Sequence, residues 1–301
     1  MADRLAVGSW LLDIRSFMNI PILMYHSISD SDDYRELPSA CRPIGYRTGV
    51  GVFEDHLFVL KKAGWSTISL EELVSRQELP EKPVVITFDD GYADNYHTVL
   101  PRLQEYGFRA IFFISVSYLG KPGMMGVEEV SELLRFGMEI GSHGMGHDLL
   151  SGLGESELDW ELKESKQRLS EQFSIATDFF SLPRGYLPSS LPRLARGAGY
   201  RGLCTSSPGL NTERTDPFAL RRFPVRSNWG REELEAILAG KGKLYRRLLL
   251  VENIRAFLRK RYRYKHLLPN YNKIKPQRQE ERKFHRRDAE SAEKDKKQAS
   301  V

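Results

Sequence analysis

Asp89 and Asp90 are the residues of this chain whose types and placement best suit acid–base and metal chemistry. They stand side by side in Thr87-Phe-Asp-Asp-Gly91, directly after the apolar run Pro83–Phe88. A simple turn at a strand end would also explain an Asp-Gly pair. Two adjacent carboxylates at a strand end point in different directions, so one can bind a metal ion while the other acts as a base.

His143 and His147 form a second candidate pair, because they are four residues apart in His143-Gly-Met-Gly-His147. On a helical turn or tight loop this spacing places both imidazoles on one side, as metal ligands require. Such a pair often arises by chance. Together with Asp90, however, it makes one carboxylate and two imidazoles, a ligand set that leaves metal positions open for water and substrate.

Two further polar residues follow apolar runs of the same kind. His26 comes after Ile20–Tyr25 and, taken alone, is more simply interpreted as an ordinary strand-end histidine. Arg184 comes after Phe179–Leu182. Because the carboxyl ends of barrel strands share one face, these residues and the two candidate pairs are expected to converge there. The remaining histidines are expected to be surface or packing residues: His56, His97, His266 and His285.

The elements that would position these side chains alternate between short apolar runs and longer helical patterns. Nearly continuous apolar strands are typical of a parallel sheet that is buried on both faces. The expected strands are Ile20–Tyr25, Trp65–Ser69, Pro83–Phe88, Arg109–Ile114, Met138–Ser142, Phe179–Leu182, Arg201–Thr205 and Ala219–Val225. The expected helices are Phe53–Ala63, Leu70–Ser75, Asp94–Tyr106, Val127–Phe136, Glu155–Phe173, Leu191–Ala198 and Arg231–Ala239.

This alternation predicts an α/β fold, a distorted (β/α) barrel of about seven strands with a basic C-terminal helical tail. An open doubly wound sheet is the alternative. No glycine-rich phosphate loop follows the early strands, which disfavours nucleotide binding. Residues Asp30–Val52 are rich in proline and glycine, and a loop of this length is typical of a lid, a binding loop or a disordered segment.

Charge divides the 301 residues into two parts. Residues 241–301 contain 20 Lys and Arg against 7 Asp and Glu, whereas residues 1–240 contain 25 against 33. We therefore expect an N-terminal segment at 1–19, a catalytic domain at 20–240, a basic amphipathic helix at 241–268 and a disordered charged tail at 269–301. Within Leu244–Leu268, apolar residues recur at helical spacing, so the helix either packs across the barrel or lies on an anionic membrane surface.

The compartment is predicted from the cysteines and the N-terminus. The two cysteines, Cys41 and Cys204, cannot form a disulfide framework and are interpreted as reduced packing residues. No secretory signal pattern and no apolar run of membrane-spanning length is recognisable. The expected location is the cytoplasm, with a peripheral position at the inner face of the membrane as the further possibility. No nucleic-acid partner is expected, because the basic tail matches no recognised module.

Thr87–Gly91 and Gly141–His147 resemble the first two motifs of the polysaccharide deacetylases, the NodB-homology or family-four carbohydrate esterases. Leu182-Pro-Arg-Gly185 resembles their third motif, and the resemblance covers about residues 20–240. It implies that Asp89 is the general base and that Asp90, His143 and His147 bind the metal ion.

The proton donor is implied by a branch of the same family. No Leu-x-His motif appears near Ile237 or beyond it, where the family usually carries its catalytic acid. Ile22-Leu-Met-Tyr-His26-Ser instead resembles the circularly permuted branch that includes the biofilm poly-N-acetylglucosamine deacetylases, in which the histidine precedes the Asp-Asp motif. The resemblance therefore makes His26 the acid.

Three positions depart from the family pattern. Gly144 stands where the family has Ser or Thr, so a hydrogen bond that supports the loop is expected to be missing. Ser181 stands where the third motif often has Arg, and Arg184 stands where an aromatic residue is usual. Arg184 would either reach back to Asp89 or bind substrate, and by resemblance its backbone N–H would hold the oxyanion.

The resemblance implies a metal-dependent hydrolase that removes N-acetyl groups from a poly- or oligosaccharide, giving acetate and a free amino sugar. A lipid-linked exopolysaccharide precursor is one candidate substrate. One divalent ion is expected, with zinc favoured over cobalt, nickel, manganese or iron. The alternatives are an O-deacetylase, an inactive saccharide-binding relative and a ferrous oxygenase, whose usual ligands place His and Asp together as His-x-Asp.

Overall fold

A computed structural model describes residues 18–31, 35–43, 45–75, 78–147, 149–185 and 187–262, with only the backbone at 259–262. The chain divides into two compact units, and the first ends at Glu252. The described part of the second unit is the end of one helix. Within the described residues, no helix combines the length and the apolar character needed to cross a bilayer. The domain bounds expected from the sequence stay a prediction.

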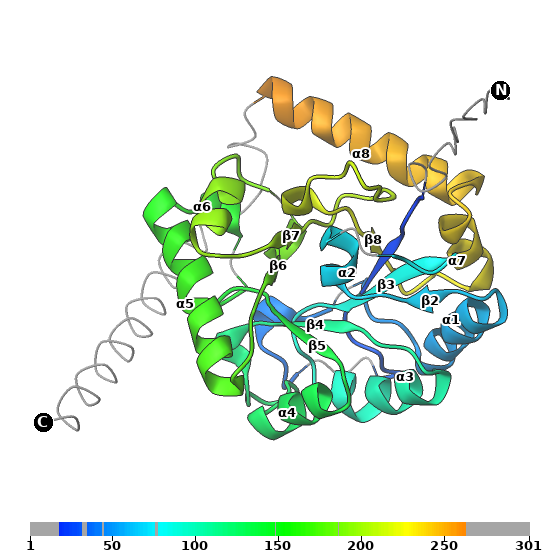
Figure 1. Cartoon of the computed structure of the whole chain (residues 1–301), viewed down its shortest axis with the longest axis horizontal. Coiled ribbons are helices and arrows are strands. Elements are labelled where there is room, and N and C mark those ends of the chain that lie inside the picture. Colours follow the sequence, from blue (N-terminus) through cyan, green and yellow to red (C-terminus); the bar gives the residue numbers. More distant parts are fainter. Residues whose placement is uncertain are drawn as a thin grey trace, which may run out of the picture. The chain divides into compact units, whose positions relative to one another are not determined.

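The first unit is built on a parallel sheet that curves into a partial barrel (Figure 1). Its strands are β1 (Ile22–Tyr25), β2 (Ser66–Thr67), β3 (Pro83–Phe88), β4 (Ile111–Ile114), β5 (Glu139–Ser142), β6 (Phe179–Ser181), β7 (Gly202–Cys204) and β8 (Phe223–Pro224). Seven of them follow the order β7-β6-β5-β4-β3-β1-β8, and β2 pairs with β3 outside this path. The predicted α/β fold, a distorted barrel of about seven strands, is confirmed.

The two ends of the sheet approach each other at the segment before β8. Leu220 forms a parallel bridge with Cys204 at the end of β7, and the Leu220 N–H donates to the carbonyl of Leu203 at 2.9 Å. The segment around Leu220 thus lies against β7, while β8 itself pairs with β1. This seam brings the chain that precedes β8 into the interior of the barrel.

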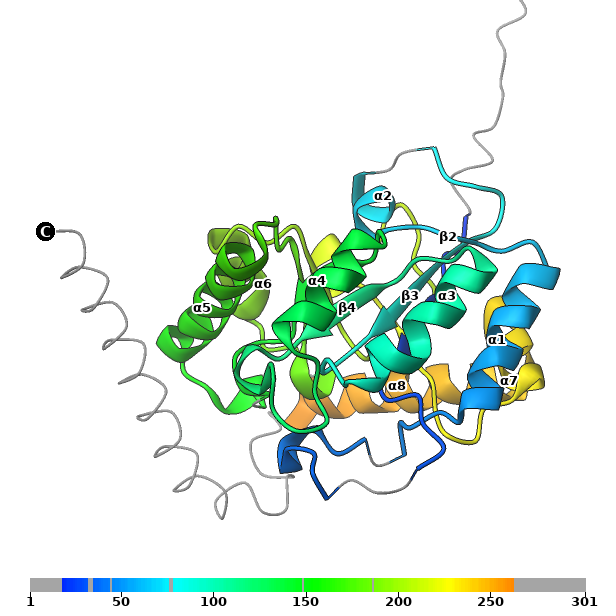
Figure 2. The ribbon, with the colours of Figure 1, turned by 90° about the horizontal axis from the view of Figure 1, so that it is seen from below.

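Helices cover the outside of the sheet, and α3 lies between α1 and α4 in both views (Figures 1 and 2). The α-helices are α1 (Val50–Lys62), α2 (Leu70–Ser75), α3 (Leu100–Tyr106), α4 (Val127–Arg135), α5 (Glu155–Phe173), α6 (Leu191–Gly197), α7 (Arg231–Leu238) and α8 (Gly242–Tyr262). Short helical turns are η2 (Ser39–Cys41), η3 (Asn95–Val99), η4 (Val116–Tyr118), η5 (Leu150–Gly152), η6 (Pro183–Gly185) and η7 (Pro217–Ala219).

The central strands form because their residues are apolar on both faces. All six residues of β3 are buried, as a strand covered on both sides requires. The Phe88 ring stacks on Tyr25 of β1 and on Phe112 of β4, with ring centroids 5.4 and 4.9 Å apart. These rings belong to the main hydrophobic core, which also contains apolar residues of the outer helices. The sheet is thereby a rigid support for the residues at its carboxyl ends.

Two of the predicted elements have a different form in the structure. The helix expected at Asp94–Tyr106 begins as a π-helical turn, η3, before α3 continues it. Pro101 explains the change, because it has no N–H to donate to the preceding turn. The strand expected at Ala219–Val225 is reduced to Phe223–Pro224, since the N–H groups of Leu220 and Arg222 bond to Leu203 and Ser207 instead.

The first half of α8 packs against the main core through Leu244, Tyr245 and Leu248. Further along, Leu250 is 60% exposed, Ile254 50% and Phe257 63%. Packing therefore accounts for the beginning of the predicted basic helix. Residues 263–268 of that prediction, and the predicted tail at 269–301, lie outside the described residues.

Glu139, at the start of β5, makes the stability of the fold depend on pH. Burial raises its pKa to about 7 from the ordinary 4.5, Arg109 opposes the shift, and Glu72 and Glu71 add to it. Between these two pH values the native protein holds a proton that the unfolded chain has released, so stability falls as pH rises through this window. We expect the free energy of unfolding of Glu139→Gln, relative to that of the parent, to rise by about 1–2 kcal/mol from acidic to mildly alkaline pH. Urea unfolding at both pH values measures this change.

Glu128→Gln is the matched control, because Glu128 is exposed on α4. Its stability relative to the parent should be the same at both pH values. An equal response of the two variants would mean that Glu139 does not bind the extra proton.

Candidate metal and catalytic site

The predicted site residues gather at the carboxyl ends of the strands. His26 follows β1, Asp89 and Asp90 follow β3, and His143 follows β5. The carboxylates of Asp89 and Asp90 and the imidazole of His143 all act electrostatically on His26. The structure thus brings together side chains that the sequence separates by more than a hundred residues.

Asp90 is the centre of the cluster. Its Oδ1 lies 3.3 Å from Nε2 of His143 and 3.1 Å from Nε2 of His147, while its Oδ2 accepts a hydrogen bond of 2.7 Å from the Tyr92 hydroxyl. Burial alone would raise the pKa of Asp90, but the two imidazoles outweigh burial and hold it well below its usual range. The carboxylate is therefore ionised.

A divalent cation fits this arrangement. Asp90 is 3% exposed, and among the residues that the structure describes none donates a hydrogen bond to its Oδ1, although two ring nitrogens face it. Two donors that share a tetrahedral ion at about 2.0–2.1 Å are themselves about 3.3 Å apart. The separation of Asp90 Oδ1 from each imidazole matches this value, so Asp90 can share an ion with either histidine.

The loop that carries the two histidines is held by backbone hydrogen bonds. The His143 N–H donates to the Ile114 carbonyl at 2.9 Å. Gly144 has a φ of 81°, a left-handed conformation that favours glycine, and its N–H donates to Ser142 Oγ at 3.1 Å. The Met145 N–H donates to Glu161 Oε2 at 2.8 Å. The support expected to be missing because of Gly144 is thus supplied by Ser142 and Glu161.

Asp89 is bound by Arg222 rather than by Arg184. Arg222 Nη1 donates to Asp89 Oδ1 at 2.7 Å and Nη2 to Oδ2 at 2.8 Å. Ser181 Oγ lies 3.0 Å from Asp89 Oδ2 and also accepts from Arg222 Nη2 at 2.8 Å. The alternative in which Arg184 reaches back to Asp89 is therefore wrong, and Ser181, which departs from the family pattern, is part of the Asp89 environment.

Arg222 was missed by the sequence reasoning, although a signal for it exists. It lies in the strand expected at Ala219–Val225, where a buried guanidinium must find a partner. The side chain is fully buried, and its Nε donates to the Thr205 carbonyl at 2.8 Å. Burial raises the pKa of Asp89, but Arg222 and the neighbouring imidazoles outweigh it and lower the pKa below its usual value.

His26 lies beside this pair with a half-buried side chain. Its backbone carbonyl accepts from Asn95 Nδ2 at 2.9 Å, a bond to the π-helical turn η3. Its ring packs on the Tyr46 ring with centroids 4.8 Å apart. The Arg226 guanidinium lies over the Tyr46 ring, 4.1 Å from its centroid. Burial lowers the pKa of His26 more than Asp90 and Asp89 raise it. The imidazolium form is accordingly a stronger acid than free imidazolium.

Arg184 stands at the exposed edge of the cluster. Its φ is 59°, an uncommon left-handed conformation for a residue other than glycine. The pKa of the Cys41 thiol is raised, chiefly by burial, and the pKa of His147 is raised by Asp90 against burial; the charge of Arg184 opposes both rises. Arg184 is thus placed where it can meet an anionic or polar group that enters the site.

Cys41 is a second residue that the sequence reasoning did not place in the site. Its Sγ, one oxygen of Asp90 and one ring nitrogen of His147 all lie within 4.8 Å of one another. Burial raises the pKa of the Cys41 thiol, and Asp90 adds to the shift. Cys41 is buried, as expected for a packing residue. The expectation did not include that its sulfur faces Asp90 and His147.

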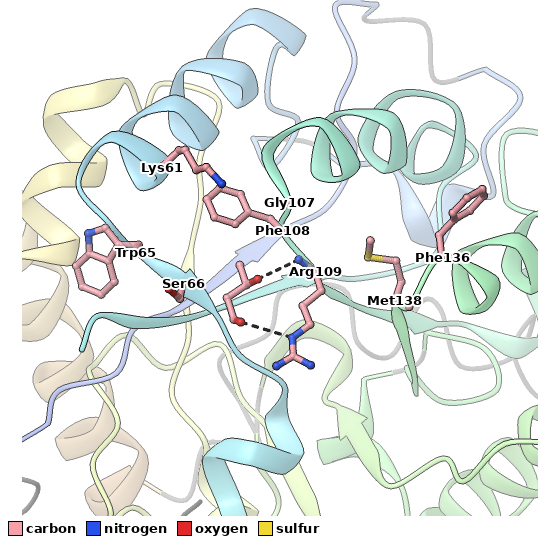
Figure 3. Close-up of a pocket in the computed structure, with 10 residues that line it drawn as sticks. Lys61, Trp65, Ser66, Gly107, Phe108, Arg109, Phe136 and Met138 are labelled. Atoms are coloured by element: carbon pink, nitrogen blue, oxygen red, sulfur yellow. Dashed lines mark hydrogen bonds between the residues drawn. The ribbon is translucent and has the colours of Figure 1, made fainter. Parts of the chain in front are cut away.

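A cavity of about 400 Å³ lies elsewhere, at the amino ends of β2, β4 and β5 (Figure 3). Its two cations are already engaged: Lys61 Nζ donates to the Tyr106 carbonyl at 2.9 Å, and Arg109 pairs with Glu72. The Arg109 N–H also donates to Thr67 Oγ1 at 3.0 Å. None of the candidate catalytic residues lines this cavity, so its size does not make it the active site.

The fold and this cluster together define a polysaccharide deacetylase, and the chain belongs to that family. The family's sequence profile matches residues 76–203. The chain is 32% identical over 210 residues to YxkH of Bacillus subtilis, which carries the family's name, covering 68% of this chain and 71% of YxkH. Its class is that of hydrolases acting on carbon–nitrogen bonds other than peptide bonds.

Two further proteins are similar over shorter or more divergent stretches. The peptidoglycan N-acetylglucosamine deacetylase of Bacillus cereus is 31% identical over 122 residues, which cover 40% of this chain and 55% of that relative. The solved structure of the Streptococcus pyogenes deacetylase PplD in complex with acetate superposes with a TM-score of 0.67 at 25% identity, covering 73% of this chain and 98% of PplD.

Replacing Arg222 should lower the free energy of unfolding, because Asp89 would be left as a buried carboxylate without a partner. Arg222→Met leaves Asp89 charged and without its bidentate partner, so we expect a loss of about 3–5 kcal/mol in the free energy of unfolding. Adding Asp89→Asn removes the uncompensated charge, and the double variant should lose less than the sum of the two single changes. Urea unfolding of the four proteins measures both effects.

Arg221→Met is the matched control, because the neighbouring Arg221 is exposed. It should change stability by no more than about 0.5 kcal/mol. A loss for Arg222→Met as small as that of the control would show that the pair does not stabilise the fold.

Proposed function

We propose that the chain is a divalent-metal-dependent enzyme that removes N-acetyl groups from a glucosamine-containing poly- or oligosaccharide. The observation that carries this proposal is the divergence of two neighbouring carboxylates. Asp90 faces two imidazoles at 3.1–3.3 Å, while Asp89 is paired with a buried guanidinium. One carboxylate is thus free to hold a cation and the other to accept a proton. The name of the Bacillus cereus relative supports the choice of sugar.

Asp90, His143 and His147 would hold the ion, which would polarise the acetyl carbonyl and lower the pKa of a bound water. Asp89 takes the proton from the attacking water. Its low pKa keeps it ionised and ready to accept, and Arg222 and Ser181 fix the orientation of its two oxygens. The backbone N–H of Arg184, in its left-handed conformation, is proposed to bind the oxyanion.

His26 gives a proton to the leaving nitrogen, without which the amine would depart as an unstable anion. A histidine whose pKa is lowered by burial donates its proton more readily than a free one. The bond from Asn95 to the His26 carbonyl and the packing of Tyr46 on the ring hold the donor in place. The products are acetate and a free amino group on the sugar.

The altered third motif raised the possibility of an inactive saccharide-binding relative. That alternative was based on the missing arginine of the third motif. Arg222, from the segment before β8, gives Asp89 a bidentate partner instead. We therefore propose a working catalytic centre. Zinc is the ion we favour, since imidazole and carboxylate ligands in a tetrahedral arrangement suit it.

Acetate release from N-acetylated chito-oligosaccharides tests this function. The zinc-loaded protein should release acetate, and a chelator should abolish the release. Asp89→Asn and His26→Asn should each reduce kcat by about 10²–10⁴-fold, because each removes one proton transfer. His97→Asn is the matched control, since His97 is exposed and pairs with Glu129 away from the cluster; it should keep the parent rate.

Two results would contradict the proposal. Release from O-acetylated sugars but not from N-acetylated ones would make the enzyme an O-deacetylase. A protein that binds zinc and sugar but releases no acetate from any substrate would be a saccharide-binding relative.

We further propose that the later part of α8 meets an anionic lipid surface, which would suit a lipid-linked saccharide substrate. Ile254 and Phe257 are exposed and lie three residues apart, so they share a helix face. The exposed cations Lys243, Arg246, Arg247 and Arg255 lie on the same helix. Apolar residues with basic neighbours favour an interfacial position on anionic lipid.

Both cysteines are free, which supports a reducing compartment and the inner membrane face.

Sedimentation of the full chain with phosphatidylglycerol-containing vesicles tests this position. The parent should bind, and binding should weaken as salt is added. Ile254→Ser with Phe257→Ser should weaken binding at least about tenfold, because two apolar side chains lose their burial in lipid. Phe136→Ser is the control, since Phe136 is also an exposed phenylalanine but lies at the C-terminal end of α4. Equal binding of both variants would exclude α8 as the contact.

A further inference from the structure

Cys41 is held beside the cluster by contacts that fix its position. It ends the turn η2 in the segment between β1 and α1, and its side chain is 1% exposed. It packs with Tyr92 and Met124. The Tyr92 hydroxyl contacts the Cys41 carbonyl and donates to Asp90 Oδ2 at 2.7 Å. One side chain therefore links the Cys41 turn to the carboxylate at the centre of the candidate metal site.

The Cys41 sulfur faces two of the donors that would hold the ion, Asp90 and His147. Cys41 Sγ, an oxygen of Asp90 and a ring nitrogen of His147 lie within 4.8 Å of one another. Independently, Asp90 Oδ1 is buried without a hydrogen-bond partner among the described residues, on the side where the imidazoles converge. A buried carboxylate oxygen that receives no proton donor is the kind of atom that a cation satisfies.

We propose that Cys41 is a further, sulfur ligand of the divalent ion bound by Asp90, His143 and His147. This inference rests on the metal site of the proposed function and adds a residue to it. On binding, the S–H bond breaks, the proton passes to solvent, and a sulfur lone pair forms the bond to the ion. Thiolate is a soft ligand, so Cys41 favours zinc, cobalt and cadmium over magnesium and manganese.

A sulfur ligand also affects how the site works. Four protein donors fill a tetrahedral coordination sphere, whereas a catalytic ion needs a position for water. Water can enter only when the thiolate leaves or when the ion accepts a fifth ligand. Cys41 would thus affect how readily the ion becomes open to water and substrate.

Cobalt titration of the metal-depleted full chain tests this ligand by absorption. Visible d–d bands report that Co²⁺ is bound, and an intense near-ultraviolet charge-transfer band reports a sulfur–cobalt bond. The parent should show both. Cys41→Ser should keep the visible bands and lose the near-ultraviolet band. Cys204→Ser, which removes the other of the two cysteines, should keep both.

The Cys204→Ser protein makes the result independent of how well Cys41→Ser folds. Its only thiol is Cys41, so a near-ultraviolet band there can come from no other residue. Visible bands without the charge-transfer band in this protein would overturn the Cys41 inference and leave the proposed metal site intact. Absence of all cobalt bands from the parent would overturn the metal site itself, and the inference with it.

Metal preference gives a second readout. In competition with a chelator, the affinity of Cys41→Ser for Cd²⁺ should fall about tenfold or more relative to Cys204→Ser, because a soft ligand is lost. Affinity for Mg²⁺ should change little. An equal cadmium affinity in both variants would contradict the assignment.

Discussion

The site depends on one backbone feature: two neighbouring carboxylates must face different partners. Asp89 continues the line of β3 and meets Arg222, whereas Asp90 has a φ of 78°. This left-handed conformation turns the Asp90 side chain toward His143 and His147. It costs about 1–3 kcal/mol for a residue other than glycine, and it persists only where the surroundings determine it. Tyr92 and the two imidazoles supply those surroundings, so the strain and the candidate chemistry are located at the same residue.

Arg222, at the seam of the barrel, links the stability of the fold to the candidate site. Arg222 comes from the segment just before β8 and contacts residues of three other strands or strand ends: Asp89 and Thr87 at β3, Ser181 of β6 and Thr205 after β7. A guanidinium in this position needs every one of its donors satisfied, because the barrel interior excludes water. The ion pair thereby connects the strand that carries the candidate base to the strands that close the sheet.

Much of this arrangement could be predicted from the sequence. The bounds of β3, α2 and α5 agree with the predicted ranges to the residue, because continuous apolar runs and helical periodicity determine them. The convergence of Asp89, Asp90, His143 and His147 follows from the shared edge of parallel strands. Arg222 and Cys41 could not be found in this way, since their roles arise from contacts between segments distant in sequence. The π-helical turn at η3 depends on Pro101, whose effect on helix type the hydrophobic pattern does not report.

The strand order also shows which part of the chain makes a complete working unit. β1 lies between β3 and β8 in the sheet, although β1 comes before and β8 after the stretch 76–203 that carries the family signature. A polypeptide cut at those limits would retain the Asp-Asp and His-x-x-x-His signatures. It would lack His26, Cys41 and Arg222, and it would leave β3 with an unpaired edge open to self-association. The signature marks the family, but the smallest autonomous module must extend to both flanking strands.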